Sequence, residues 1–310
     1  MGGVNMTKNV LICGNDPLVE AILQHNIIED KSINFIWYQK EVEFSDAVED
    51  VLTSGVLAKN LGLTATNTPD WSSIDLLLIG DLDVAENANL EFQQKLRSEI
   101  HWTQVIMNQA MANNFASKVC FLTEHCEEQV FSALHFSGLP VNAIFGLGTF
   151  PLSILAEKLI SNILKIDARQ VHVSVLGTSA NALPAWSRGL VAGTPLLSLI
   201  AQENSLFSQD ELTAIEEQLN RCSKRSLLPA ILNGLDRVFE ALFTPFAQSI
   251  PLTHQVELGG EKIAISEPVL LSTQGVSTLP TVNLSEDEKQ RFVGIKTDVL
   301  SEIQTLVRGQ

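Results

Sequence analysis

Short apolar runs alternate with stretches of helical spacing through the first half of the chain, and this alternation restricts the fold more than any other feature. The apolar runs are Asn9–Cys13, Ile33–Tyr38, Gly62–Thr66, Ile74–Ile79, Lys118–Leu122 and Ala143–Phe145. The stretches of helical spacing between them are Pro17–Gln24, Glu43–Lys59, Asn89–Asn114 and Cys126–Phe136. Strands that are separated by crossover helices pair in parallel. The pattern therefore predicts an α/β fold with a Rossmann-type, doubly wound parallel sheet.

The pattern changes after Gly148, so we expect a second domain of the α+β type. The predicted helices there are Pro151–Leu164, Gln209–Asn220 and Leu227–Phe243, and the predicted strands are Val171–Leu176, Leu252–Leu258, Lys262–Ser266 and Pro268–Ser272. The pair Gly259-Gly260 predicts a tight turn between two of these strands. A Ser-x-x-Glu capping box at Ser285 opens a last helix with one apolar stripe: Phe292, Ile295, Val299, Ile303 and Leu306. The predicted domains are residues 1–148 and 149–310.

Charge and cysteine content restrict the partners and the compartment. The formal net charge is −16, whereas nucleic acids and anionic membranes bind basic surfaces. The four cysteines are scattered with no CxxC spacing, which indicates reduced thiols in a cytoplasmic protein. We find no apolar segment typical of a signal peptide or of a membrane span.

The range Val171–Leu196 has the form of an active-site rim without the usual chemistry. An apolar strand ends at Gly177, and a polar loop with Thr178, Ser179 and Asn181 follows. Loops at the end of a rigid strand often hold catalytic groups. This loop contains no histidine, carboxylate or cysteine, so the rim lacks a group that titrates near neutral pH.

Several short motifs occur in a recognisable order along the chain. They are Phe136-Ser137-Gly138-Leu139-Pro140, Gly146-Leu147-Gly148-Thr149, Ala156-Glu157-Lys158-Leu159, Val175-Leu176-Gly177, Pro184-Ala185-Trp186-Ser187, Gln274-Gly275-Val276 and Leu284-Ser285-Glu286-Asp287-Glu288. Their order resembles that of the lactate/malate dehydrogenase family of NAD-dependent 2-hydroxy acid dehydrogenases, including its hydroxyisocaproate branch. The resemblance implies a nucleotide-binding half, a substrate half with mixed sheet and helices, and NAD as cofactor.

Four groups that this family uses in catalysis are missing at the matching positions. The family's acid/base histidine lies in a Gly-Glu-His-Gly loop, and here Ser179 takes its place, with Asn181 two residues later. The family's aspartate and carboxylate-binding arginine follow its Gly-x-Gly-Thr, where this chain has Phe150-Pro151. The mobile loop that carries a second arginine matches Asp81–Glu91, which has four acidic residues and no Lys or Arg. No catalytic residue of the family is therefore intact.

The positions that match the family's cofactor site are Gly14, Asn15, Tyr38 and Glu124. Of the three glycines in the fingerprint G-x-G-x-x-G only Gly14 is present, because Asp16 and Val19 take the other two places. Tyr38 stands at the end of the second strand, where it either stacks on an adenine or packs in the core. The altered fingerprint weakens the expected cradle for a dinucleotide.

Two residues are candidates for a rebuilt site. His125 lies after the fifth predicted strand, between Glu124 and Cys126, and Arg188 follows Trp186-Ser187. His125 is either a displaced acid/base or part of an ordinary helix start, and Arg188 either lines a cleft or pairs locally. The spacing around His125 fits no zinc pattern, so we expect no metal.

Two functional hypotheses follow from these observations. In the first, the chain is a non-catalytic dehydrogenase relative with a binding or regulatory role. In the second, it is an NAD-dependent oxidoreductase of the 2-hydroxy acid dehydrogenase family that acts on an atypical substrate. In both, we expect a homo-oligomer, either a dimer or a tetramer, with a small-molecule ligand between the domains and no nucleic acid, membrane or metal partner.

Overall fold

The fold is known from a computed structural model that describes residues 7–14, 17–40, 44–81, 92–201, 207–222, 226–279 and 283–308. The chain forms two compact units: unit 1 comprises Met1–His125 and Ser132–Ile144, and unit 2 comprises Cys126–Phe131 and Phe145–Gln310. The sequence predicts a single boundary after residue 148, whereas these units also place the start of one helix, at Cys126–Phe131, with unit 2.

Unit 1 contains a parallel sheet, as the alternating pattern predicts. Its strands are β1 (Lys8–Cys13), β2 (Ile33–Tyr38), β3 (Gly62–Thr66), β4 (Leu76–Ile79) and β5 (Lys118–Phe121). They are ordered β3-β2-β1-β4-β5, and each neighbouring pair is parallel. The central strands β1 and β4 are buried along nearly their whole length, which explains their continuous apolar sequences.

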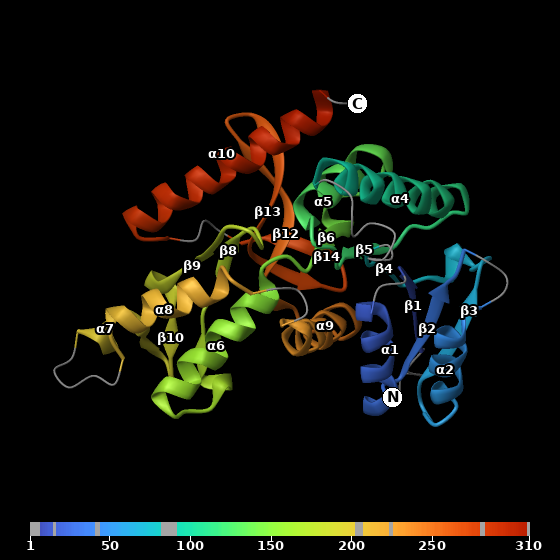
Figure 1. The fold of residues 1–310 in the computed structure, drawn as a ribbon, viewed down its shortest axis with the longest axis horizontal. Coiled ribbons are helices and arrows are strands. Elements are labelled where there is room, and N and C mark those ends of the chain that lie inside the picture. Colours follow the sequence, from blue (N-terminus) through green and yellow to red (C-terminus); the bar gives the residue numbers. More distant parts are fainter. Residues whose placement is uncertain are drawn as a thin grey trace. The chain divides into compact units, whose positions relative to one another are not determined.

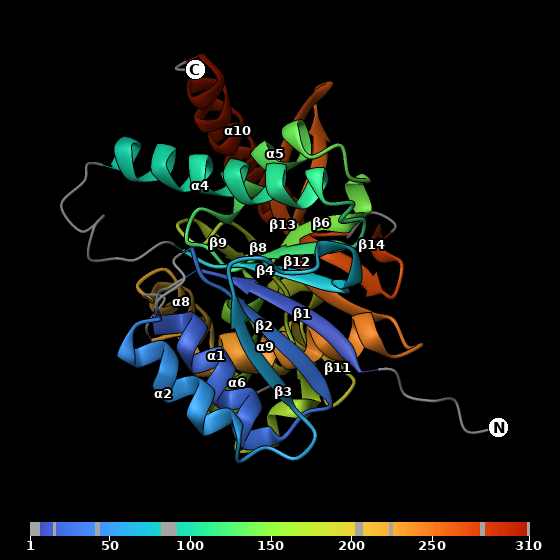
Figure 2. The ribbon, with the colours of Figure 1, turned by 90° about the vertical axis from the view of Figure 1, so that its right-hand side faces the viewer.

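The helices of unit 1 lie between these strands in the sequence. They are α1 (Pro17–Glu29), α2 (Asp46–Gly55) and α4 (Phe92–Ala112), with the short turns η1 (Trp71–Ser73) and η2 (Val141–Ala143). Figure 2 shows α1 and α2 side by side on one face of the sheet. Helix α5 (Cys126–Phe136) has the predicted bounds, and α2 is shorter than its predicted range Glu43–Lys59. The predicted Rossmann-type architecture is confirmed.

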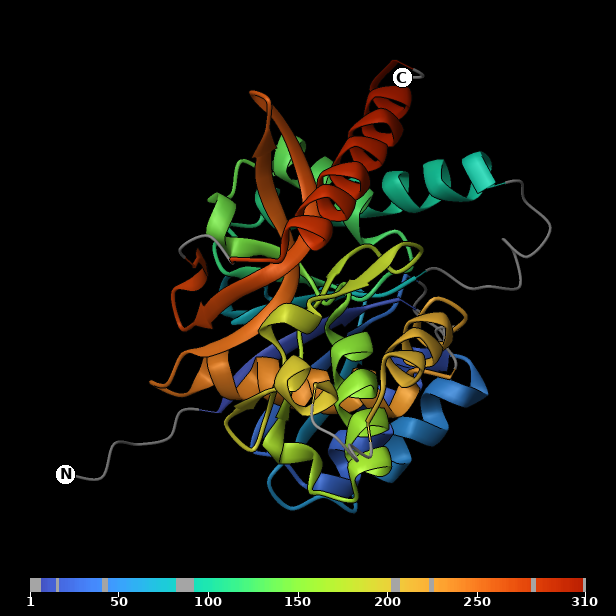
Figure 3. The ribbon, with the colours of Figure 1, turned by 90° about the vertical axis from the view of Figure 1, so that its left-hand side faces the viewer.

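Unit 2 is built on a mostly antiparallel sheet in the order β6-β12-β13-β8-β9, with β14 beside β13. The strands are β6 (Ile144–Gly146), β8 (Val175–Gly177), β9 (Ala182–Pro184), β12 (Gln248–Leu258), β13 (Glu261–Ser272) and β14 (Gly275–Thr278). The long hairpin of β12 and β13 is visible in Figures 1 and 3. Gly259 and Gly260 both have positive φ, at 61° and 89°, so the predicted tight turn is confirmed.

Several predicted strands of unit 2 have different bounds in the structure. The predicted strands Lys262–Ser266 and Pro268–Ser272 are one strand, β13 (Glu261–Ser272), which pairs with β8 at Ser266 and with β14 from Val269 to Ser272. The predicted strand Val171–Leu176 is two strands. Its first part, β7 (Val171–His172), belongs to a separate three-stranded sheet with β10 (Leu190–Val191) and β11 (Thr194–Pro195).

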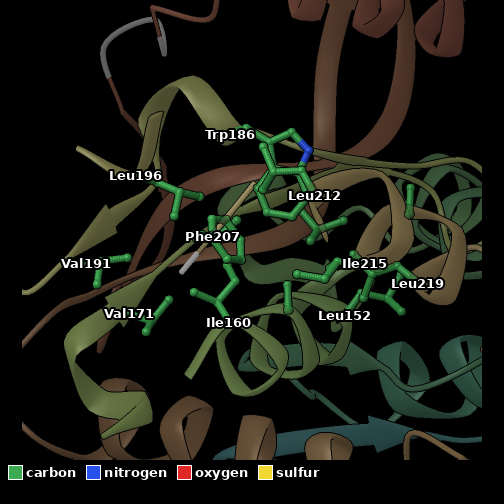
Figure 4. Close-up of a cluster of buried hydrophobic side chains, with 14 residues drawn as sticks. Leu152, Ile160, Val171, Trp186, Val191, Leu196, Phe207, Leu212, Ile215 and Leu219 are labelled. Atoms are coloured by element: carbon green, nitrogen blue, oxygen red, sulfur yellow. The ribbon is translucent and has the colours of Figure 1, made fainter. Parts of the chain in front are cut away.

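Helices cover the sheet of unit 2 and enclose its core. They are α6 (Phe150–Leu164), α7 (Leu196–Ile200), α8 (Gln209–Leu219), α9 (Leu228–Phe243) and α10 (Glu286–Arg308), with the turns η3 (Ala168–Gln170) and η4 (Trp186–Arg188). Figure 4 shows Trp186 and Phe207 among the apolar side chains of α6 and α8. The stripe of α10 packs on the sheet through Phe292, Ile295, Val299 and Ile303, while the side chain of Leu306 lies outside the described residues.

Hydrogen bonds from distant segments fix the start of α10. The predicted capping box is present, because the Glu288 amide donates to Ser285 Oγ at 3.3 Å and the Ser285 amide donates to Glu288 Oε2 at 3.0 Å. The Ser187 amide also donates to Glu288 Oε1 at 2.9 Å. Burial raises the pKa of Glu288, but these donors more than offset it and the net pKa lies below the ordinary value.

We predict that Gly148→Ala destabilises the protein and that Gly294→Ala does not. Gly148 has φ +49°, and a Cβ there would meet the hydroxyls of Ser266 and Thr253, whereas Gly294 on α10 has open space around it. Gly148→Ala should lower the free energy of unfolding by more than about 2 kcal/mol. Gly294→Ala should raise the free energy of unfolding by about 0.5–1 kcal/mol, because alanine has a higher helix propensity than glycine. Denaturant unfolding of both variants checks this; equal stability would show that the turn at Gly148 tolerates a side chain.

Candidate functional site

The rim loop after β8 is a closed turn of the backbone. The Thr178 amide donates to the Asn181 carbonyl at 3.3 Å, and the Asn181 amide donates to the Thr178 carbonyl at 3.2 Å. Thr178 Oγ1 also accepts from the Asn181 amide at 3.0 Å. Ser179 and Asn181 are exposed. The loop therefore presents hydroxyl and amide groups, which do not exchange a proton near neutral pH.

The corner before α6 is buried and bonded to the sheet. Thr149 and Phe150 are 0% and 2% exposed. Thr149 Oγ1 donates to the Val175 carbonyl at 2.5 Å, so it does not cap the helix. The Val175 amide in turn donates to Ser153 Oγ at 2.9 Å. Helix α6 starts at once, with Pro151 in its first turn, and no carboxylate or guanidinium belongs to this corner's own sequence.

A guanidinium reaches the corner from another helix. Arg237 on α9 places its Cζ 4.8 Å from the centre of the Phe150 ring. Its Nε donates to Gln248 Oε1 at 3.4 Å. Burial raises the pKa of the nearby Glu157 to about 7, and the attraction of Arg237 offsets this only in part. No local pattern in the sequence assigns a role to Arg237 or Glu157, because none shows that α9 packs against α6.

The first glycine of the fingerprint forms a tightly packed turn in unit 1. Gly14 has φ +129°, and a Cβ there would lie 3.0 Å from the Asp81 carbonyl oxygen and 3.2 Å from a Val19 methyl group. The same methyl group lies 3.2 Å from the Cβ position of Gly80. Val19, at the fingerprint's third glycine position, is 0% exposed. Its side chain therefore fills the space between the ends of β1 and β4.

Aromatic side chains of β2 pack against this turn. The Trp37 indole Nε1 donates to the Gly14 carbonyl at 3.0 Å, and Trp37 is 1% exposed. The next residue, Tyr38, is buried, with Trp71 and Trp102 ring centres 6.3 Å and 6.2 Å away. Its hydroxyl donates to Gln109 Oε1 at 3.1 Å. To stack on an adenine, the Tyr38 ring would have to leave this packing.

Charged groups collect at the carboxyl edge of the unit 1 sheet. Lys95 Nζ lies 2.8 Å from Glu124 Oε2 and 3.8 Å from Glu99 Oε1. His125 is the N-cap residue of α5 without a side-chain capping bond. Burial lowers its pKa, partly offset by Glu124. The imidazole is therefore mainly neutral at pH 7, and the cluster is acidic.

The remaining predicted residues are placed as follows. Arg188 is exposed at the end of η4. Asn15, Asp16 and residues 82–91 lie outside the described residues.

Within the described ranges, no three His, Cys, Asp or Glu side chains are placed to hold one metal ion, and no helix is long and apolar enough to cross a membrane. The four cysteines, all within the described residues, form no disulfide bond with one another.

The described residues around Gly14 are engaged in the packing of unit 1. The turn's carbonyl is bonded to Trp37, Val19 fills the space that a third glycine leaves open, and Lys95 is paired with carboxylates. A pyrophosphate needs open amides and positive potential at this place. The assignment of Gly14, Tyr38 and Glu124 to a cofactor stays a prediction.

Sequence comparison identifies one family. The sequence model of the family described as lactate/malate dehydrogenase, alpha/beta C-terminal domain, matches residues 153–309, about half of the chain. L-lactate dehydrogenase 3 of Bacillus cereus is 24% identical over 196 residues, which cover 60% of this chain and 62% of that protein. L-lactate dehydrogenase 1 of Listeria monocytogenes is 25% identical over 194 residues, 60% of this chain and 61% of that protein. The matches thus span about three fifths of these relatives.

Solved structures agree in fold at low identity. Minor L-lactate dehydrogenase from Enterococcus mundtii, in its ligands-bound form, aligns with TM-score 0.86 and 18% identity over 96% of this chain and 98% of that chain. Lactate dehydrogenase from Cryptosporidium parvum, complexed with lactic acid and β-nicotinamide adenine dinucleotide, aligns with TM-score 0.83 and 17% identity over 98% and 99% of the two chains. These similarities show the fold.

We predict that Trp37→Phe destabilises unit 1 more than Trp71→Phe does. The first change leaves the buried Gly14 carbonyl without its indole donor, which typically costs about 1–3 kcal/mol beyond the lost volume. Trp71→Phe changes the side-chain volume by the same amount, but it is Trp37 and not Trp71 that donates the hydrogen bond to the Gly14 turn. Chemical denaturation of the two variants measures the difference. Equal losses would mean that the Trp37 bond contributes nothing to stability.

Proposed function

This chain belongs to the lactate/malate dehydrogenase family, and from that premise we propose that it is a member without 2-oxo acid reductase activity that has a binding or regulatory role. The observation that carries the proposal is the corner before α6. Where the family's aspartate and substrate arginine stand, this chain has Phe150 and Pro151, which are both buried, and α6 begins directly at Phe150.

The rim loop supports the same proposal independently. Ser179, at the place of the acid/base histidine, is exposed in a tight turn, and the partner carboxylate that would activate a hydroxyl is absent from the loop's sequence. General acid–base catalysis typically contributes about 10²–10⁴-fold in rate. The loss of this group together with the carboxylate clamp removes the family's means of polarising and protonating a carbonyl.

The proposal includes weak or absent NAD binding. Phosphate groups bind where amides and cations point outward, whereas the packing of Trp37 and Val19 uses the Gly14 turn for the protein's own stability. The ligand of the protein is then a small molecule other than a 2-oxo acid. A homo-oligomeric assembly belongs to the proposal as well.

The second candidate function is that of an NAD-dependent oxidoreductase with an atypical substrate. The observation that favours it is the sequence similarity to proteins named L-lactate dehydrogenase. In this case His125 or Arg188 takes over a lost role. Arg188 is exposed, and the imidazole of His125 is neutral near pH 7 because of burial, which makes His125 the better acceptor of a proton.

We predict that neither NADH nor NADPH raises the melting temperature beyond AMP and ATP controls, and that no turnover occurs with pyruvate, oxaloacetate or 2-oxoisocaproate. Thermal shift and NADH absorbance measure these two properties. Specific stabilisation by NADH would reject the non-binding part of the proposal. Turnover of any of these acids would reject the proposal as a whole and favour the second candidate.

We also predict that Ser179→His alone gives no clear activity on pyruvate or oxaloacetate, because the clamp before α6 is still missing. Ser179 is exposed, so the variant should fold, and circular dichroism provides that control. Clear activity of this single variant would show that the missing arginine and aspartate do not limit the reaction.

A further inference from the structure

The strand at the end of the unit 1 sheet has an open edge. Figure 2 shows β3 beside β2, its one neighbour in the order β3-β2-β1-β4-β5. The Gln39 amide donates to the Thr66 carbonyl at 3.0 Å, so the backbone polar groups of Thr66 point toward β2. Because these groups alternate in direction along a strand, those of Leu63 and Ala65 point away from β2. Within the described ranges no residue bonds to them.

The strand β3 also lacks the features that usually protect an edge. Edge strands often carry a charged side chain or a proline, whereas the sequence of β3 is Gly-Leu-Thr-Ala-Thr. The end strand of the unit 2 sheet, β9, is different. It contains Pro184, and its Ala182 amide donates to the Asn220 side chain at 3.1 Å. This contrast indicates that the edge of β3 is a surface for pairing with another strand.

Exposed apolar side chains border this edge. Helix α2 lies on the face of β3 that carries Leu63, since a Cβ at Gly55 would be 3.1 Å from Leu63 Cδ2. The two residues after Gly55, Val56 and Leu57, are 82% and 83% exposed. Apolar side chains that lie together on a surface mark interaction sites more often than scattered ones do. The edge therefore combines unpaired backbone groups with an apolar border.

The charges beyond the two ends of β3 favour a second copy of this chain as the partner. Lys59 lies five positions before Thr64, and Asp70 lies six positions after it. Both side chains are exposed. In an antiparallel pair of two β3 strands that is centred on Thr64, the Lys59 end of one strand meets the Asp70 end of the other. The edge is therefore complementary to itself in charge as well as in hydrogen bonding.

We propose that two copies of this chain associate through β3, as an antiparallel strand pair that joins the two unit 1 sheets into one. Leu63 exchanges two backbone hydrogen bonds with the partner's Ala65, and a two-fold axis repeats them. The axis passes beside Thr64, which is exposed in the single chain. This interface rests on the homo-oligomeric assembly that belongs to the proposed function, and it does not depend on the missing reductase activity.

A charge at Thr64 tests the interface in the full chain. In Thr64→Lys two ammonium groups face each other across the axis, and like charges directly opposite destabilise a strand pair. The Kd of the assembly, measured by analytical ultracentrifugation, should rise about fivefold or more. Thr64→Val keeps the β-branched shape without a charge, so its Kd should stay within about twofold of the wild type. Circular dichroism shows whether both variants fold.

A cysteine at the same position provides a second test, which does not need an accurate Kd. Residues opposite each other at this place in an antiparallel pair have Cα atoms about 4.5 Å apart, a distance that a disulfide bond spans. Thr64→Cys should therefore form a covalent dimer with oxidised glutathione, which accepts the two electrons and two protons of the thiols. Thr297→Cys on α10 is equally exposed and should remain uncoupled, like the wild type.

The outcomes separate the interface from the assembly. Dissociation of Thr64→Lys and specific coupling of Thr64→Cys support the proposal. If the wild type is an oligomer, but Thr64→Lys keeps its Kd and Thr64→Cys does not couple, the interface is wrong while the homo-oligomeric part of the proposed function stands. A wild type that remains monomeric overturns both, and an extended segment of another protein is then the partner to test at this edge.

Discussion

The hydrogen bonds at the Gly148-Thr149 corner are the constraint on which unit 2 depends. Thr149 bonds to β8 through its side chain and to β13 through its amide. These bonds fix where α6 begins, and α6 forms part of the core cluster with Trp186 and Phe207. A positive φ at Gly148 is required because the backbone must turn beside two hydroxyls. Polar groups that are fully buried and paired in this way specify one geometry.

The same corner shows how the fold is held together at the place of the family's substrate groups. A clamp of the family type needs a guanidinium that points out from the first turns of α6. Here that turn is occupied by Phe150, and the ring supports Arg237 from α9. The corner thus uses its residues to join helices and strands.

The sequence predicts the elements well and the contacts between distant elements poorly. Apolar periodicity is a local property, so α5 and the Gly259-Gly260 turn have their expected positions. The predicted strand Val171–Leu176 fails because its two halves pair with different sheets. Glu127 and Thr253 are 126 positions apart, and no pattern in either segment indicates that they meet. The bond from Trp37 to Gly14 is hidden for the same reason.

Packing and chemistry depend on separate sets of residues in this chain. The strands β1 and β4 are held by side chains that are 0% exposed, such as Leu11 and Leu77, whereas Ser179 and Asn181 at the rim are exposed. Substitutions at exposed positions usually change stability by less than about 0.5 kcal/mol. The residues at the rim can therefore change while the core stays intact. For this reason fold similarity alone carries no evidence of reductase activity.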